Sequence, residues 1–226
     1  ITAFMAAAVK VAAFGALLRF LYVAFGGNRW DWQPALWVIA IATMLLGSIV
    51  AITQTDIKRM LAYSSIAQAG FILVGVIATN PEGVAAVMFY LAAYGFATLG
   101  AFGVISLVRD SGGGEATHLS RWAGLGRRSP WLAAAFALFL LSFAGIPLTS
   151  GFIGKFTVFE AAITSDATPL VIVGVVASII AAFFYIRVIV LMYFTDSAED
   201  APTVAVPSAW TTLAISIAAA VTVVLG

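Results

Sequence analysis

Long apolar runs separated by short polar links make up most of this chain. Each run is apolar on all sides and rich in Ala, Leu and Phe, unlike the alternating segments of membrane barrels. Because a helix needs about 20 mainly apolar residues to cross a bilayer, we expect an all-α, polytopic membrane protein forming a single transmembrane domain over residues 1–226. The seven predicted crossings are Ile1–Phe25, Ala35–Thr53, Met60–Thr79, Val84–Val108, Trp131–Thr164, Leu170–Phe194 and Ala209–Gly226.

Turn-forming residues stand between these runs. Gly26–Asn28 and Pro34 bound the first link, and Asn80–Gly83 has the composition of a turn. The longest link, Arg109–Pro130, holds the only histidine, His118, which we interpret as a solvated loop residue. Because the chain begins with Ile inside an apolar run, we expect it to be a fragment of a longer protein.

The composition agrees with a membrane protein and excludes several other classes. Hydrophobic residues make up 63% of the 226 and charged residues 9%, and the mean hydropathy is +1.09. Soluble domains are roughly 45–50% apolar and about 25% charged. The net charge of +1 excludes a nucleic-acid partner held by a basic field, and the absence of cysteine excludes disulfides and thiolate iron–sulfur ligands. With a single histidine as well, we expect no metal and no cofactor in this chain.

Basic residues predict how the chain is oriented in the membrane. Cytoplasmic loops carry an excess of Lys and Arg. Arg19 and Arg29 lie on one predicted side, and the other side carries six cations: Lys58, Arg59, Arg109, Arg121, Arg127 and Arg128. We therefore expect the Lys58/Arg121 loops in the cytoplasm and the C-terminus outside. This assumes that Trp131–Thr164 crosses once, because a re-entrant hairpin there would reverse every later segment.

Besides Arg19, which lies near the end of its predicted helix, three cations lie inside predicted crossings: Lys10, Lys155 and Arg187. Each ionisable group at such a position costs roughly 2.5–3.5 kcal/mol on insertion scales. Lys10 is followed by about fifteen mainly apolar residues, or about 22 Å of helix, and is too deep to reach the outer surface. We predict a functional role for it; a structural lysine paired with an acid elsewhere is the alternative. Arg187 stays protonated and fits a structural or electrostatic role better than proton transfer. We assign no role to Glu160.

The run Trp131–Thr164 is longer than one crossing needs and contains a helix-breaking sequence. Pro147 removes a helical hydrogen bond, and Gly145 and Gly151 flank it. Broken backbone at membrane depth occurs where it is buried in protein or lines a hydrated cavity. Lys155 follows the break, with Thr149 and Ser150 beside it, as in the ion pathways of transporters. A Pro-kinked packing helix is the plainer alternative.

Two other predicted helices supply polar groups. Ser64, Ser65 and Gln68 lie within about one turn, with Ser64 and Gln68 at i, i+4. Tyr90 and Tyr94 are spaced likewise in the next run. These side chains can line a water-filled path, although serines also bond to their own helix backbone.

These motifs together resemble a known family. The segment Gln54–Ile66, QTDIKRMLAYSSI, resembles the signature of the antiporter-like membrane subunits of respiratory complex I. The segment Ala144–Phe156, AGIPLTSGFIGKF, is similar to the broken-helix motif of the subunit N branch. Lys10–Gly15 and Tyr90–Gly103 fit the same branch.

The resemblance implies a fold of fourteen helices with two inverted five-helix repeats, of which these would be the last seven. Residues 35–194 would form the second repeat, with Lys10 as the central lysine and Lys155 as the lysine of the broken helix. The sister branch, subunit M, is expected to carry glutamate at the Lys155 position. Related subunits often carry histidine where this chain has Gln68, which cannot titrate.

The implied function is proton translocation through buried lysines and hydrated polar residues, coupled to redox chemistry elsewhere in NADH–quinone oxidoreductase. The implied location is the bacterial inner membrane, and the implied partners are lipid and other membrane-arm subunits. NADH, quinone, FMN and the iron–sulfur clusters would belong to those other subunits. Two alternatives remain open: a subunit of a multisubunit sodium/proton antiporter, and a passive scaffold subunit. A stand-alone solute carrier is disfavoured because no substrate-shaped polar cluster is present.

Overall fold

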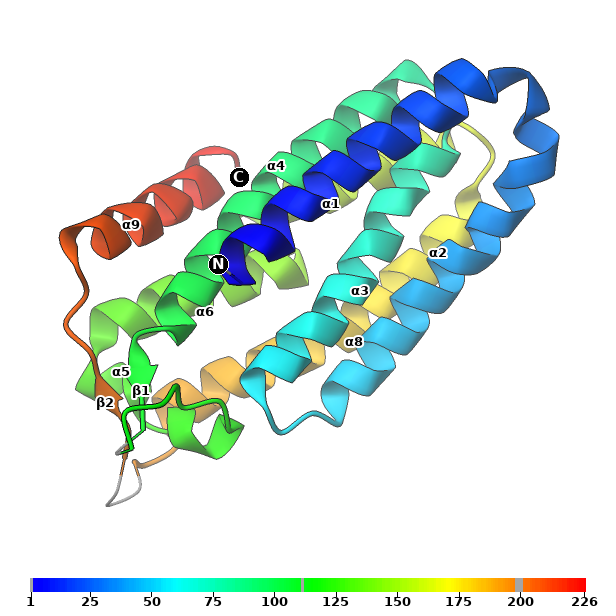
Figure 1. Ribbon diagram of the computed structural model, residues 1–226. Helices are drawn as coiled ribbons and strands as arrows, with labels where there is room; N and C mark the ends of the chain where they lie inside the picture. Colours follow the sequence, from blue (N-terminus) through cyan, green and yellow to red (C-terminus); the bar gives the residue numbers. More distant parts are fainter. Residues whose placement is uncertain (1, 111, 198–200) are drawn as a thin grey trace.

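The computed structural model describes residues 2–110, 112–197 and 201–226 as a bundle of helices (Figure 1). Five helical segments within these ranges are long and apolar enough to cross a membrane. They are α1 (Thr2–Arg19) with its π-helical extension Phe20–Ala24, α2 (Arg29–Ile52) with the 3-10 turn Gly26–Asn28, α3 (Ile57–Ile77), α4 (Pro81–Ile105) and α8 (Thr168–Phe194).

The other described elements are shorter. They are β1 (Val108–Arg109), the 3-10 helix Leu119–Trp122, α5 (Leu125–Arg128), α6 (Pro130–Ala144), α7 (Ser150–Ile163), β2 (Thr203–Val204) and α9 (Ala209–Val224). The prediction of seven crossing helices is therefore confirmed for five. The predicted crossings at 131–164 and 209–226 contain helices of 14 to 16 residues, which is shorter than the usual span.

Helix α2 begins six residues before the predicted start at Ala35. Pro34 lies in its second turn, where the missing N–H removes a single hydrogen bond. Asp31 lies in the first turn, where a carboxylate interacts favourably with the helix dipole and accepts from the Asn28 side chain at 3.4 Å. The interpretation of Pro34 as the end of the link was wrong for this reason.

Glycines allow α2 and α3 to pack closely. A Cβ on Gly47 of α2 would lie 2.6 Å from the Ala67 nitrogen of α3, and one on Gly70 would lie 2.9 Å from the Ala40 carbonyl oxygen of α2. Small residues at such positions let membrane helices approach without a side chain between them. Helix α3 is packed in addition against α4, α7 and α8, and its polar residues Ser64 and Gln68 are buried in the protein interior.

Helices α6 and α7 run one after the other along α4, in the opposite direction. A Cβ on Gly100 of α4 would lie 2.2 Å from the ring of Phe139, and one on Gly154 of α7 would lie 2.9 Å from the ring of Tyr90. At the far end the Asn80 side chain donates to the Ala161 carbonyl at 3.0 Å. The chain therefore passes α4 once and does not return as a hairpin.

The predicted interruption lies at 145–149, between the end of α6 and the start of α7. Gly151, predicted as part of the break, is instead the second residue of α7. Its role is close packing, because a Cβ there would lie 1.8 Å from the Ser142 carbonyl oxygen. The backbone leaves the helical conformation at Gly145, whose φ of +79° suits glycine, and at Leu148, whose φ is +72°.

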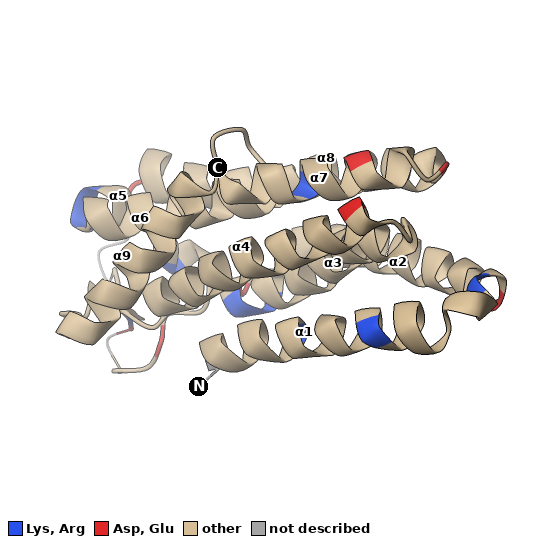
Figure 2. Ribbon diagram, turned by 90° about the horizontal axis from the view of Figure 1, so that it is seen from above, with Lys and Arg blue, Asp and Glu red and all other residues tan. Residues whose placement is uncertain are grey.

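The loops that carry most of the predicted cytoplasmic cations gather at one end of the bundle. Lys58 pairs with Glu115, Arg127 with Asp196 at 2.7 Å, and β1 pairs with β2 in antiparallel register. Figure 2 shows long stretches of helix without charged residues away from this end. His118 is exposed and accepts from the Ser120 backbone N–H at 3.4 Å, which agrees with a solvated loop histidine.

Asp56 starts helix α3. Its side chain accepts from the Arg59 backbone N–H at 2.9 Å, as an N-cap residue does. Burial raises the pKa of the Asp56 carboxyl, but hydrogen bonds from the Thr117 side chain and the Arg59 and Lys58 backbone outweigh burial and hold that pKa below its ordinary value.

Candidate functional site

The end of α6 leaves two backbone carbonyls without helical partners. The Gly145 N–H donates to the Ser142 carbonyl and the Ile146 N–H to the Leu141 carbonyl, which is the Schellman pattern. Pro147 follows and cannot continue the helix. The carbonyl oxygens of Phe143 and Ala144 are thereby free to accept from a side chain.

Lys155 of α7 is the side chain that donates to these two carbonyl oxygens. Its Nζ donates to the Phe143 carbonyl at 2.9 Å, to the Ala144 carbonyl at 3.0 Å and to the Ser178 Oγ of α8 at 2.9 Å. The side chain is 5% exposed, and Nζ lies 4.5 Å from the centre of the Phe71 ring. Freed carbonyls at the C-terminal end of a helix stabilise a cation.

Gln68 connects the same carbonyl to α4. Its Nε2 donates to the Phe143 carbonyl at 2.9 Å, and its Oε1 accepts from the Tyr90 hydroxyl at 2.5 Å. Gln68 and Tyr90 are both almost fully buried. The Phe143 carbonyl is therefore shared by Lys155 and Gln68, so that groups from α3, α4, α6 and α7 form one polar cluster.

Lys10 forms a second polar cluster. Its Nζ donates to the Ser65 carbonyl at 2.8 Å, to the Ser65 hydroxyl and to the Tyr94 hydroxyl at 3.3 Å. It lies 4.7 Å from the centre of the Tyr94 ring, which adds a cation–π contact. Lys10 is half-buried and directed toward α3 and α4.

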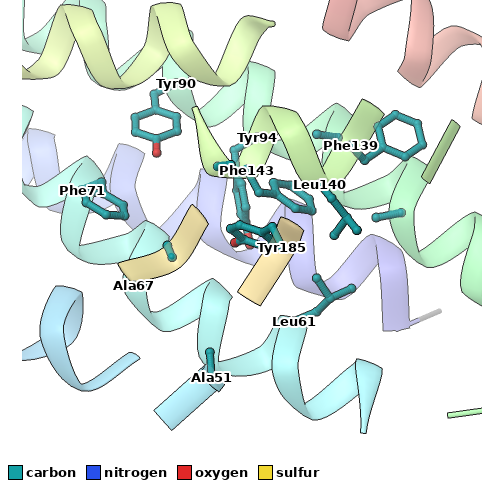
Figure 3. Packing of buried hydrophobic residues seen from close by; sticks show 14 of the residues in the cluster. Ala51, Leu61, Ala67, Phe71, Tyr90, Tyr94, Phe139, Leu140, Phe143 and Tyr185 are labelled. Atoms are coloured by element: carbon teal, nitrogen blue, oxygen red, sulfur yellow. The ribbon is translucent and has the colours of Figure 1, made fainter. Parts of the chain in front are cut away.

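Aromatic side chains stand between the two lysine clusters. The Phe143 ring lies 5.5 Å from Tyr94 and 5.9 Å from Tyr185, centre to centre. Figure 3 shows these three rings grouped together. The Tyr185 hydroxyl of α8 is hydrogen-bonded to Ser64. In the described part of the chain, no direct hydrogen bond links Lys10 or its partners to the Lys155 cluster.

Thr149 and Ser150 lie at the start of α7. The Thr149 hydroxyl donates to the Ile146 carbonyl at 2.7 Å and does not cap the helix. The Ser150 hydroxyl is buried, and no described group bonds to it. Buried hydroxyls are usually hydrogen-bonded to protein or to water, so the Ser150 hydroxyl is available to bond to a water molecule.

Three contributing residues are absent from the sequence-based prediction. Ser178 is a direct partner of Lys155, and Tyr185 is the partner of Ser64. Ser142 accepts from the Gly151 N–H at 3.1 Å and so ties α6 to α7. Each is a polar residue within a mainly apolar run, and this is the feature by which the sequence could have indicated a role for it.

The remaining candidates lie outside these clusters. Arg187 is exposed and donates to the Ile52 carbonyl at the end of α2 at 3.0 Å, which fits the structural role expected for it. Glu160 is exposed near the end of α7. Among the described residues no group of three His, Cys, Asp or Glu side chains is arranged to hold a metal ion.

The sequence of this chain is similar to that of a known family. Residues 1–181 match the profile of the family described as NADH:quinone oxidoreductase/Mrp antiporter, TM. NADH-quinone oxidoreductase subunit N 3 of Streptomyces griseus is 68% identical over 226 residues, which are 100% of this chain and 41% of that protein. Subunit N of Rhodococcus opacus is 65% identical, over 100% of this chain and 42% of that protein.

Solved structures give the same relationship. Respiratory complex I from Thermus thermophilus with bound aureothin contains a chain that matches with a TM-score of 0.83 and 30% identity, over 99% of this chain and 48% of that one. A chain of the Mrp complex from Dietzia sp. DQ12-45-1b matches with a TM-score of 0.74 and 29% identity, over 85% of this chain and 35% of that one. The chain thus spans less than half the length of these relatives. It belongs to the transmembrane family shared by NADH:quinone oxidoreductases and Mrp antiporters.

Proposed function

We propose that this chain is part of a membrane-arm subunit of NADH–quinone oxidoreductase and carries protons between Lys10 and Lys155. The observation that carries the proposal is the coordination of Lys155 by two carbonyls and a hydroxyl at a helix break. These oxygens stabilise the charged lysine, while burial favours the neutral one. A lysine held between these two influences can accept and release a proton.

The proposed path has titratable ends and a polar middle. From Lys10 it passes Ser65 and Tyr94, and it reaches Lys155 by way of Gln68 and Tyr90. Ser64 and Tyr185 line its side. Gln68 cannot titrate, so it orients water and does not carry the proton itself. Water completes the gap between the clusters, with Thr149 and Ser150 as hydroxyls at the break.

The architecture implied by the family is part of the proposal. Helices α6 and α7 together make one crossing and α9 makes another, which gives seven crossings in total. Residues 35–194 correspond to the second five-helix repeat. The Lys58/Arg121 end faces the bacterial cytoplasm and the C-terminus lies outside. Other membrane-arm subunits bind the protein laterally, and NADH, quinone, FMN and the iron–sulfur clusters act in other subunits.

Sodium/proton exchange is the second candidate, and the match to the Mrp complex favours it. A scaffold role is the third. Proton uptake by inverted membranes, driven by NADH and measured in sodium-containing and sodium-free buffer, separates redox-coupled translocation from sodium/proton exchange. The proposal predicts uptake that depends on NADH and not on sodium. Sodium-dependent uptake without NADH would support the antiporter instead.

Lys10→Ala tests the role of the central lysine. We expect the variant to assemble but to lose most proton uptake per NADH oxidised, because the substitution removes the ammonium group that α1 directs toward Ser65 of α3. Lys58→Ala is the matched control, since Lys58 lies in a surface ion pair with Glu115. Normal proton uptake in Lys10→Ala would leave only a structural role for Lys10.

A further inference from the structure

A pocket at the Lys58 end of α8 is lined by a cation, Arg187, that forms no ion pair with any described carboxylate. The pocket has a volume of about 380 Å³ and lies between α8 and the loops that precede α3 and α5. Arg187 lines it together with Thr55, His118, Ser120 and Thr195, and Val190 and Leu191 form its apolar part. Polar groups thus lie beside an apolar groove on the outer surface of a predicted membrane helix.

Arg187 lies at membrane depth near one end of α8. It is seven residues before Phe194, or about 10 Å along the helix. An arginine side chain at this distance from the helix end is long enough to reach the polar headgroup layer of the bilayer. The guanidinium therefore lies where phosphate groups of lipids are found.

No carboxylate of the described residues lies within ion-pair distance of Arg187. Asp196, close to it in sequence, pairs with Arg127 at 2.7 Å, and Asp56 accepts from the Arg59 backbone N–H. With the described residues it forms one hydrogen bond, from Nη1 to the Ile52 carbonyl at 3.0 Å. Most of its five donors remain available for a ligand in the pocket.

We propose that this pocket binds the phosphate group of an anionic phospholipid. The Arg187 guanidinium pairs with the phosphate, because arginine matches phosphate geometry with two parallel donors. The hydroxyls of Ser120, Thr55 and Thr195 are donors on the pocket wall, and an acyl chain lies against Val190 and Leu191. Basic pockets at membrane helices commonly hold anionic headgroups. This inference does not depend on the proposed proton path.

The test measures lipid retained by the full-length protein in its purified membrane complex. After delipidation, the complex is titrated with phosphatidylglycerol or diacylglycerol and examined by native mass spectrometry. The wild type should bind one phosphatidylglycerol more than Arg187→Gln does, with about tenfold higher affinity, as expected for one charge-assisted contact. Diacylglycerol, which lacks phosphate, should not distinguish the two.

Two more variants keep the test decisive. Arg187→Lys should recover part of the binding, because it restores the charge but not the paired donors. Val190→Trp should weaken binding by filling the apolar part of the pocket while Arg187 is retained. Equal phosphatidylglycerol retention in wild type, Arg187→Gln and Val190→Trp would overturn the proposal. Displacement of the lipid by millimolar inorganic phosphate would contradict it too, since it would indicate a free-anion site.

Discussion

Lys155 illustrates how a buried cation is accommodated without an acid. Its three partners are neutral oxygens, and no described carboxylate forms an ion pair with it. A carboxylate would hold the lysine permanently charged, whereas neutral acceptors leave both protonation states accessible. This chemistry is what a carrier requires. A structural lysine would gain more from a paired acid.

Gln68 is the residue that joins the Lys155 cluster to α4. We predict that Gln68→Leu destabilises the protein by about 1–3 kcal/mol, because it leaves the buried Tyr90 hydroxyl without its acceptor. Thermal unfolding of the purified complex measures this as a lower Tm. Gln54→Leu is the control, since the Gln54 side chain bonds only within its own helix end and to Thr53. Equal Tm values for the two variants would contradict a bridging role for Gln68.

At the scale of single residues, charged members of the candidate site are easier to predict from the sequence than neutral ones. Lys10 and Lys155 stand out because a cation in an apolar run is costly wherever it points. Ser178 and Tyr185 do not, because a serine or tyrosine in a membrane helix is tolerated on any face. Their importance follows from the face of α8 that packs against α3 and α6, and that face is set by tertiary contacts.

Gly151, just inside α7, allows α6 and α7 to pack closely, and a substitution tests this role. Gly151→Ala should impair assembly strongly, because its Cβ would lie 1.8 Å from the Ser142 carbonyl oxygen and backbone would have to move. Gly95→Ala is the matched control within α4, where nothing lies within 4 Å of the added Cβ. The control should be neutral or more stable by about 0.5–1 kcal/mol. The yield of assembled complex measures both, and a normal yield for Gly151→Ala would contradict the close packing of α6 and α7.

The start of α3 is sensitive to the charge of Asp56. The pKa of this carboxyl is lowered from 3.8, so its stabilising contribution is complete above that value and is lost as pH falls through the lowered one. Asp56→Asn keeps the N-cap but removes the charge. We expect the Tm of wild type to exceed that of Asp56→Asn at neutral pH and the difference to vanish in strong acid. A difference that is constant with pH would show that charge is irrelevant there.

Element boundaries were predictable where local chemistry determines them. The interruption after Ala144 follows from Gly145 and Pro147, which are near in sequence. The turn predicted at Asn80–Gly83 was wrong in its extent, because Asn80 is the N-cap and Pro81–Gly83 belong to the first turn of α4. The start of α2 was not predictable from the sequence, because Pro34 is tolerated in an early helical turn as well as in a loop. The pairing of β1 with β2 was not predictable either, because two-residue strands have no periodicity and the paired residues lie 94 positions (Arg109 and Thr203) and 96 positions (Val108 and Val204) apart.

At the scale of the whole molecule, α3 and α4 organise the site. Lys10 of α1 bonds to both of them directly. Lys155 of α7 is linked to them through the Phe143 carbonyl, which Gln68 shares, and Gln68 in turn bonds to Tyr90. The glycines of the α2–α3 contact and of the α4–α7 contact let the backbones approach, so that the polar side chains meet in the interior. The central claim is that protons pass between these two lysines.

The measurement that tests this claim most directly is the number of protons translocated per NADH oxidised in Lys155→Met, with Lys155→Glu beside it. Methionine has a similar length and no titratable group, whereas glutamate can still exchange a proton, as the resemblance to the sister branch implies. Both variants are reconstituted in proteoliposomes, with NADH oxidation recorded in parallel. The account predicts that Met lowers the ratio and that Glu retains part of it. Equal, undiminished ratios in both variants would show that Lys155 carries no protons.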